Sequence, residues 1–187
     1  MQKSKNKTLV PTDEVEEKDG KYFEKATGEQ VEQIIAKMSK SLKNVVNPDE
    51  MIQKYGADSV RMYEMFMGPL TVSKPWNTQG LVGINRFLEK VWNISEKPMD
   101  EIDIKGKLED KALVALRKTF AQTIKKVTED TSSLSFNTAI SQMMIFVNEV
   151  YKAGRCPREF AEGLIKMLSC VCPHVGEEIW QQMGHDD

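Results

Sequence analysis

From Asn47 onward, apolar residues recur every three or four positions, which is the spacing of one face of an α-helix. The pattern predicts two short helices up to Gly68-Pro69, a longer helix after Trp76-Asn77, and four amphipathic helices between about residue 108 and Gly184. Amphipathic helices joined by short links pack most simply as an antiparallel bundle. The chain is therefore predicted to be mainly α, with a helical bundle preceded by a short helical connector. The clearest stripe of the bundle comprises Leu113, Leu116, Phe120, Ile124 and Val127.

Residues 1–36 follow a different pattern, that of β-strands. Residues 15–18 and 21–24 flank Asp19-Gly20, a dipeptide that supplies the positive φ angles of a two-residue hairpin turn. Thr27-Gly28 predicts a second turn. This piece has too few apolar residues for a core of its own. We therefore expect a small β-hairpin segment that packs against other parts of the protein.

Capping and breaker residues predict the boundaries. Asn47 can cap the first helix, with Pro48 in the first helical position, and Asp58 is predicted to cap the second helix. The segment from residue 97 to 106 mixes charges with breakers and predicts a domain boundary. The expected division is therefore 1–36, 37–99 and 100–187.

Composition narrows the class of protein. The chain has 187 residues with 26 basic and 28 acidic side chains, a net charge of −2, so it is not a polycation that coats nucleic acid. Three cysteines, an odd number, argue against a secreted disulfide framework. No stretch approaches the roughly 20 apolar residues of a membrane span, and the polar start is no secretory signal. We expect a cytoplasmic protein that does not bind membranes.

A possible metal cluster, Cys170-x-Cys172-x-His174, is not expected to bind metal. Helical spacing points the two cysteines in different directions, and no fourth ligand is near in the sequence. Buried free thiols are the simpler interpretation. No metal bound to this chain is predicted.

The segment Lys37-Met38-Ser39-Lys40-Ser41 carries the most informative chemistry. It is a short polar run between a strand pattern and a helix cap, so an exposed loop is predicted. Two ammonium groups three residues apart, with hydroxyls and free backbone N–H groups around them, suit a polyphosphate. On the residue types alone, a solvated loop has the same composition.

The letters of this run, KMSKS, resemble the signature of class I aminoacyl-tRNA synthetases. Later segments are similar to the leucyl-tRNA synthetase family in particular, and the resemblance runs from about Gly28 to Gly184. These segments are Asn44-Val45-Val46-Asn47-Pro48, Tyr55-Gly56-Ala57-Asp58-Ser59-Val60-Arg61, Phe66-Met67-Gly68-Pro69, the stretch from Trp76 to Trp92, Phe136-Asn137-Thr138-Ala139-Ile140, and Pro173-His174 with Glu177-Glu178-Ile179-Trp180.

The resemblance implies a role for each predicted part. Residues 1–36 would be a hairpin at the end of the catalytic domain or in its insertion, residues 37–99 the KMSKS loop and helical connector, and residues 100–187 the anticodon-binding helical bundle. The family's upstream H-x-G-H motif is missing. His174-Val175-Gly176-Glu177 imitates three of its letters on a bundle helix. The chain is thus expected to be inactive by itself.

The resemblance also implies the chemistry. In the family, ATP and leucine form leucyl-adenylate with Mg²⁺ present, and leucine is then transferred to tRNA(Leu); the parent enzyme is expected to be monomeric. Lys40 is assigned to the ATP phosphates in the transition state, with Lys37 supporting it. Met38, Ser39 and Ser41 would complete the phosphate-binding loop.

A contact with tRNA is predicted on the first helix of the bundle. Lys111, Lys118 and Lys125, with Lys107 just before them, fall on one face, opposite the face of Leu113, Phe120 and Ile124. A basic stripe can follow a phosphate backbone. A solvated helix face has the same pattern, and both interpretations stay open.

Two other functions remain as alternatives. The chain can be a free-standing RNA-binding or accessory subunit without catalysis, or part of a related class I synthetase for valine, isoleucine or methionine. The related enzymes share KMSKS but fit the stretch from Trp76 to Trp92 poorly. The chain stops at His185-Asp186-Asp187, where the family continues, which favours a truncation over a natural subunit.

Overall fold

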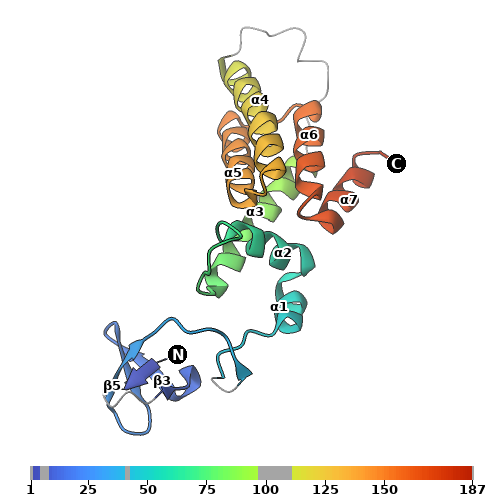
Figure 1. Cartoon of the computed structure of the whole chain (residues 1–187). Helices are drawn as coiled ribbons and strands as arrows, with labels where there is room; N and C mark the ends of the chain where they lie inside the picture. Colours follow the sequence, from blue (N-terminus) through green and yellow to red (C-terminus); the bar gives the residue numbers. More distant parts are fainter. Residues whose placement is uncertain (1, 5–8, 41–42, 97–110, 187) are drawn as a thin grey trace. The chain divides into compact units, whose positions relative to one another are not determined.

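The computed structural model describes residues 2–4, 9–40, 43–96 and 111–186 (Figure 1). Within it, the chain forms two compact units, Met1–Met51 and Ile52–Asp187. The sequence-based division at residues 36 and 99 stays a prediction, and its boundary at residue 99 lies outside the described residues.

The first unit contains a five-stranded antiparallel sheet, which is more than the predicted hairpin. The predicted turn is confirmed, because Asp19 and Gly20 have φ angles of 52° and 73° and join two paired strands. Val10 and Val31 are the buried apolar side chains among the described residues of this unit. The strands, in the order β2-β1-β5-β4-β3, are β1 (Gln2–Ser4), β2 (Leu9–Val10), β3 (Val15–Lys18), β4 (Lys21–Glu24) and β5 (Gln30–Gln33).

Helices make up most of the rest of the chain, as the apolar spacing predicts. Asn47 caps the first helix, since its side-chain oxygen Oδ1 accepts the Asp49 N–H at 3.1 Å. None of the helices among the described residues is long and apolar enough to cross a bilayer. The helices are α1 (Pro48–Tyr55), α2 (Ala57–Phe66), α3 (Thr78–Glu96), α4 (Lys111–Ser132), α5 (Phe136–Ala153), α6 (Arg158–Ser169) and α7 (Pro173–Gln182).

The core of the second unit is built around α4, α5 and α6, which lie side by side (Figure 1). Three aromatic rings meet there: the Phe120 centroid lies 4.4 Å from that of Phe160 and 5.3 Å from that of Phe146. A Cβ atom at Gly163 would lie 2.4 Å from Cζ of Phe120. Glycine at this position therefore lets α6 approach the aromatic cluster.

The buried stripe of α4 differs from the predicted one, because Leu113 is only half-buried and Ile124 is not buried. Thr123 is buried, whereas Ile124 is 44% exposed. Thr123 fits the core because its hydroxyl donates to the Thr119 carbonyl at 2.8 Å and accepts from the Gln142 side chain. The hydroxyl is satisfied, so a polar residue can occupy the buried position.

The predicted capping role of Asp58 is also wrong. Gly56 precedes α2, and the 5%-exposed Asp58 side chain reaches α7 instead. Its Oδ2 accepts the Val175 N–H at 2.7 Å, and its Oδ1 lies 2.8 Å from Nδ1 of His174. Asp58 thus caps a helix more than a hundred positions away, and it fastens α2 to α7.

Candidate functional site

The predicted phosphate loop follows β5, and its first three residues, 37–39, lie outside helices and strands. Lys37 and Lys40 are both exposed, and neither ammonium group makes an ion pair with a described residue. Met38 is 42% exposed, and Ser39 is half-buried. Ser41 lies outside the described residues. Both cations are therefore available to a ligand.

Asn44 holds this loop, a role that its place in the sequence did not predict. Its Oδ1 accepts the Ser39 N–H at 2.9 Å, and its Nδ2 donates to the Lys37 carbonyl at 3.4 Å. The Lys43 N–H donates to the Lys40 carbonyl at 3.2 Å, and Lys43 has a left-handed φ of 49°. An asparagine in a polar loop signals local backbone bonding, but the sequence cannot say which groups it binds.

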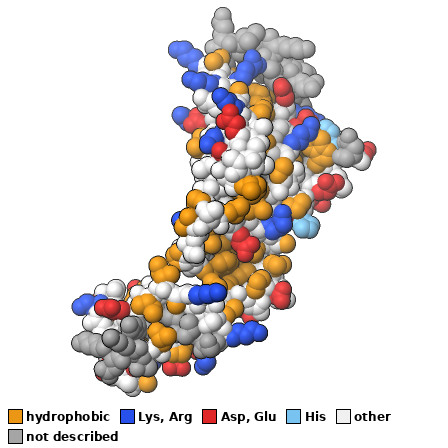
Figure 2. All heavy atoms as spheres, viewed as in Figure 1, with side chains coloured by type: hydrophobic (Ala, Val, Ile, Leu, Met, Phe, Trp, Pro, Cys, Tyr) orange, Lys and Arg blue, Asp and Glu red, His pale blue; other side chains and the backbone are white. Residues whose placement is uncertain are grey.

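The predicted basic stripe lies on α4, and Lys111, Lys118 and Lys125 are all exposed. Their spacing of seven residues places them on one face of the helix. Lys125 Nζ lies 3.9 Å from Oε1 of Glu129. Lys107 lies outside the described residues. Figure 2 shows basic side chains around the upper, helical part of the molecule with acidic ones among them.

The cysteine and histidine cluster has structural contacts. Burial raises the pKa of the Cys156 and Cys172 thiols to about 12, so neither is a thiolate at neutral pH. Cys170 is exposed, and His174 is held by Asp58. Within the described ranges, no three His, Cys, Asp or Glu side chains come together to hold a metal ion.

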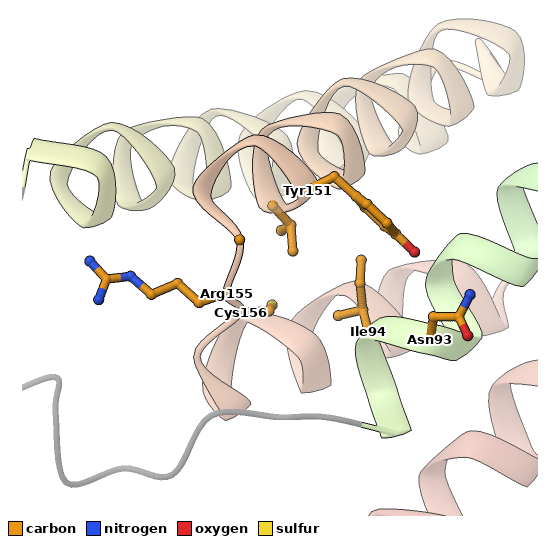
Figure 3. A pocket seen from close by; sticks show the side chains of 7 residues that line it. Asn93, Ile94, Tyr151, Arg155 and Cys156 are labelled. Carbon is orange, nitrogen blue, oxygen red and sulfur yellow. The ribbon is translucent and has the colours of Figure 1, made fainter.

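A pocket of about 250 Å³ lies beside the end of α3 and the connection from α5 to α6 (Figure 3). Asn93, Ile94, Tyr151 and Cys156 line it, and Figure 3 shows the Arg155 guanidinium pointing away from Ile94 and Tyr151. The Tyr151 hydroxyl donates to the Lys90 carbonyl at 3.2 Å. None of the predicted site residues is part of this pocket.

Two family models match the two halves of this arrangement. Residues 31–77, which contain the loop, match tRNA synthetases class I (I, L, M and V). Residues 115–187, which contain α5 to α7 and most of α4, match the anticodon-binding domain of tRNA ligase. The segment with the loop is thus similar to class I tRNA synthetases, and the helical segment is similar to the anticodon-binding domain of tRNA ligases.

Individual curated relatives are leucine–tRNA ligases. The chain is 52% identical over 179 residues to a leucine–tRNA ligase of Borrelia hermsii, covering 96% of this chain and 20% of that protein. It is 51% identical over 197 residues to a leucine–tRNA ligase of Treponema pallidum subsp. pallidum, covering 97% of this chain and 22% of that protein. The chain spans about a fifth of the length of these curated relatives.

A solved structure agrees with them. It is the agnB2 LeuRS of Agrobacterium radiobacter K84 in a ternary complex with tRNA and LeuAMS, with a TM-score of 0.68 and 27% identity, over 80% of this chain and 21% of that chain. The chain belongs to the leucyl-tRNA synthetase family. Both curated relatives and this solved structure are leucyl enzymes by name.

Proposed function

We propose that this chain serves the ligation of leucine to tRNA(Leu), supplying the ATP-phosphate loop and a tRNA-binding helical domain to a leucine–tRNA ligase. The observation that carries the proposal is the pair of exposed ammonium groups of Lys37 and Lys40, which form no ion pair with the described residues and lie within the class I match. A cation without an intramolecular ion pair is free to meet an anionic ligand.

In the first step, the leucine carboxylate attacks the α-phosphorus of ATP. The bond from the α-phosphorus to the bridging oxygen breaks, pyrophosphate leaves, and leucyl-adenylate forms. Negative charge builds on the phosphate oxygens as that bond breaks, so positioning and electrostatic stabilisation dominate catalysis. The Lys40 ammonium stabilises this charge, Lys37 supports it, and Met38, Ser39 and Ser41 complete the loop around the phosphates.

ATP in this reaction is accompanied by Mg²⁺. The described residues of this chain bring together no group of three carboxylate, imidazole or thiolate ligands, so they do not fit a protein-held ion. The proposed roles of Lys37 and Lys40 therefore rest on their own charges.

The tRNA contact is assigned to the exposed face of α4. Lys111, Lys118 and Lys125 would contact phosphates of the tRNA backbone. Such contacts position the tRNA on the protein but do not read its bases. The match of residues 115–187 to an anticodon-binding domain supports this assignment. We further propose that the ligase acts in the cytoplasm as a monomer, and that the 187-residue chain alone does not activate leucine.

Substitution of Lys40 in a leucine–tRNA ligase carrying this segment tests the proposal. Lys40→Ala should lower leucine-dependent exchange between pyrophosphate and ATP by about 10²–10³-fold, the scale for one preorganised transition-state contact. The KM for leucine should hardly change, because the ammonium acts on phosphate charge. Lys40→Arg should not restore the full rate, since the planar guanidinium group of arginine does not replace the compact charge of the lysine ammonium group.

Lys54→Ala is the matched control, because Lys54 is an exposed lysine on α1 outside the loop. It should keep the rate of the wild type. The isolated 187-residue chain should show no exchange. A Lys40→Ala ligase with the rate of the wild type would overturn the proposal.

A further inference from the structure

The side chain of Asn44 makes two hydrogen bonds that no step of the proposed reaction yet uses. Both go to backbone groups on the other side of Lys40: the amide oxygen accepts the Ser39 N–H, and the amide nitrogen donates to the Lys37 carbonyl. These bonds fix the peptide groups on both sides of Met38. Lys37 stands at one end of this fixed segment, and Lys40 follows one residue after its other end.

We infer that Asn44 is the positioning residue of this loop, holding the backbone from which Lys37 and Lys40 extend toward the phosphates. The inference rests on the proposed function. A loop without ladder hydrogen bonds otherwise leaves the origin of each lysine undefined, and small displacements of a catalytic group lower the rate strongly.

Only a neutral amide side chain of this length can make both hydrogen bonds. It offers an acceptor and a donor at once, which matches one N–H and one carbonyl. A carboxylate keeps the acceptor and loses the donor, and alanine loses both. The left-handed Lys43 next to it agrees with a backbone that is held by specific bonds, since such conformations persist where the surroundings fix them.

The loop supplies a closely matched control in Asn47. This second asparagine stands three residues further on and also makes two side-chain bonds, accepting the Asp49 N–H at 3.1 Å and donating to Oε1 of Glu50 at 3.2 Å. Its partners belong to the start of α1 rather than to the loop. Comparing Asn44→Ala with Asn47→Ala therefore separates loop positioning from general loss of an asparagine.

The first measurement is hydrogen exchange on the 187-residue chain. Asn44→Ala should accelerate exchange of the Ser39 amide, and Asn47→Ala should leave that amide unchanged. The second measurement is pyrophosphate–ATP exchange in the ligase. Asn44→Ala should lower kcat by about 10²-fold with an unchanged KM for leucine. Asn47→Ala should keep a kcat near that of the wild type. If Asn44→Ala fails to fold, Asn44→Asp serves as the second variant, and it should also lower kcat.

A double variant distinguishes positioning from a merely structural role. If Asn44 acts through Lys40, then Lys40→Ala combined with Asn44→Ala should be little slower than Lys40→Ala alone. Effects that multiply, or an Asn44→Ala ligase with the rate of the wild type beside a slow Lys40→Ala, would overturn the inference and leave the proposed function standing. A Lys40→Ala ligase with the rate of the wild type would instead refute the proposed function.

Discussion

The loop of residues 37–44 and the core of the helical unit are stabilised in opposite ways. In the core, Phe146 is fully buried against the rings of Phe120 and Phe160, so apolar surface is removed from water. In the loop, Lys37 and Lys40 are exposed, and two side-chain hydrogen bonds of Asn44 define the backbone. Burial stabilises the fold, whereas directional bonds hold exposed charges where a ligand can reach them.

Charges are treated differently in the two regions. On α4, Asp130 is buried and binds both Lys126, whose Nζ lies 2.8 Å from Oδ1, and the Thr138 hydroxyl. The lysines of the loop have no such partner among the described residues. A paired charge contributes to structure, while an unpaired one stays available for binding.

The largest expected difference between the regions appears when an apolar side chain is truncated. Phe146→Ala should lower the free energy of unfolding by about 3–5 kcal/mol, since it removes buried surface and leaves a cavity. Met38→Ala in the loop, and Ile145→Ala next to Phe146 on the exposed face, should each change it by less than about 0.5 kcal/mol. Urea unfolding followed by circular dichroism measures all three. Equal losses for Phe146→Ala and Met38→Ala would contradict the comparison.

A smaller effect is expected at Asp58, which fastens α2 to α7. Asp58→Ala should cost about 1–3 kcal/mol, because the Val175 N–H loses its acceptor. Asp58→Asn keeps an acceptor for that N–H and should cost less. Asp49→Ala, which removes an exposed acid from α1, is the control and should have little effect. If Asp58→Ala unfolds at the same urea concentration as the wild type, the connection does not stabilise the unit.

The smallest effect is a pH dependence from Asp130. Burial acts to raise the pKa of this carboxyl, but hydrogen bonds from Lys126 and Thr138 outweigh it, and the pKa lies below its ordinary value. A lowered pKa contributes stability above the unfolded-state value of about 3.9 that is lost as the pH falls through the folded-state value. Asp130→Asn should therefore lower the Tm at pH 7 and reduce the fall in Tm on acidification.

Glu129→Gln is the control for this prediction, since Glu129 is the exposed neighbour of Asp130 on α4. It should keep the slope of Tm against pH that the wild type shows. An unchanged slope in Asp130→Asn would mean that the pair with Lys126 makes no pH-dependent contribution.

Much of the local structure was predictable from sequence. The helical spacing of apolar residues predicted the helices, Asp19-Gly20 predicted the hairpin turn, and Asn47 with Pro48 predicted the start of α1. These features depend on neighbours a few positions apart, so the necessary information lies within each segment. The KMSKS letters likewise indicated the family that the comparisons confirm.

Only the tertiary structure decided which distant groups meet. Asp58 binds α7 and not its own helix, because folding brings the Val175 N–H within 2.7 Å of its carboxylate. Thr123 is buried in place of Ile124, since the side chain of Gln142 on α5 donates to its hydroxyl. Asn44 binds Lys37 and Ser39 because the loop turns back on itself. Residue type sets what a side chain can bind, but the packed chain determines which partner lies within hydrogen-bonding distance.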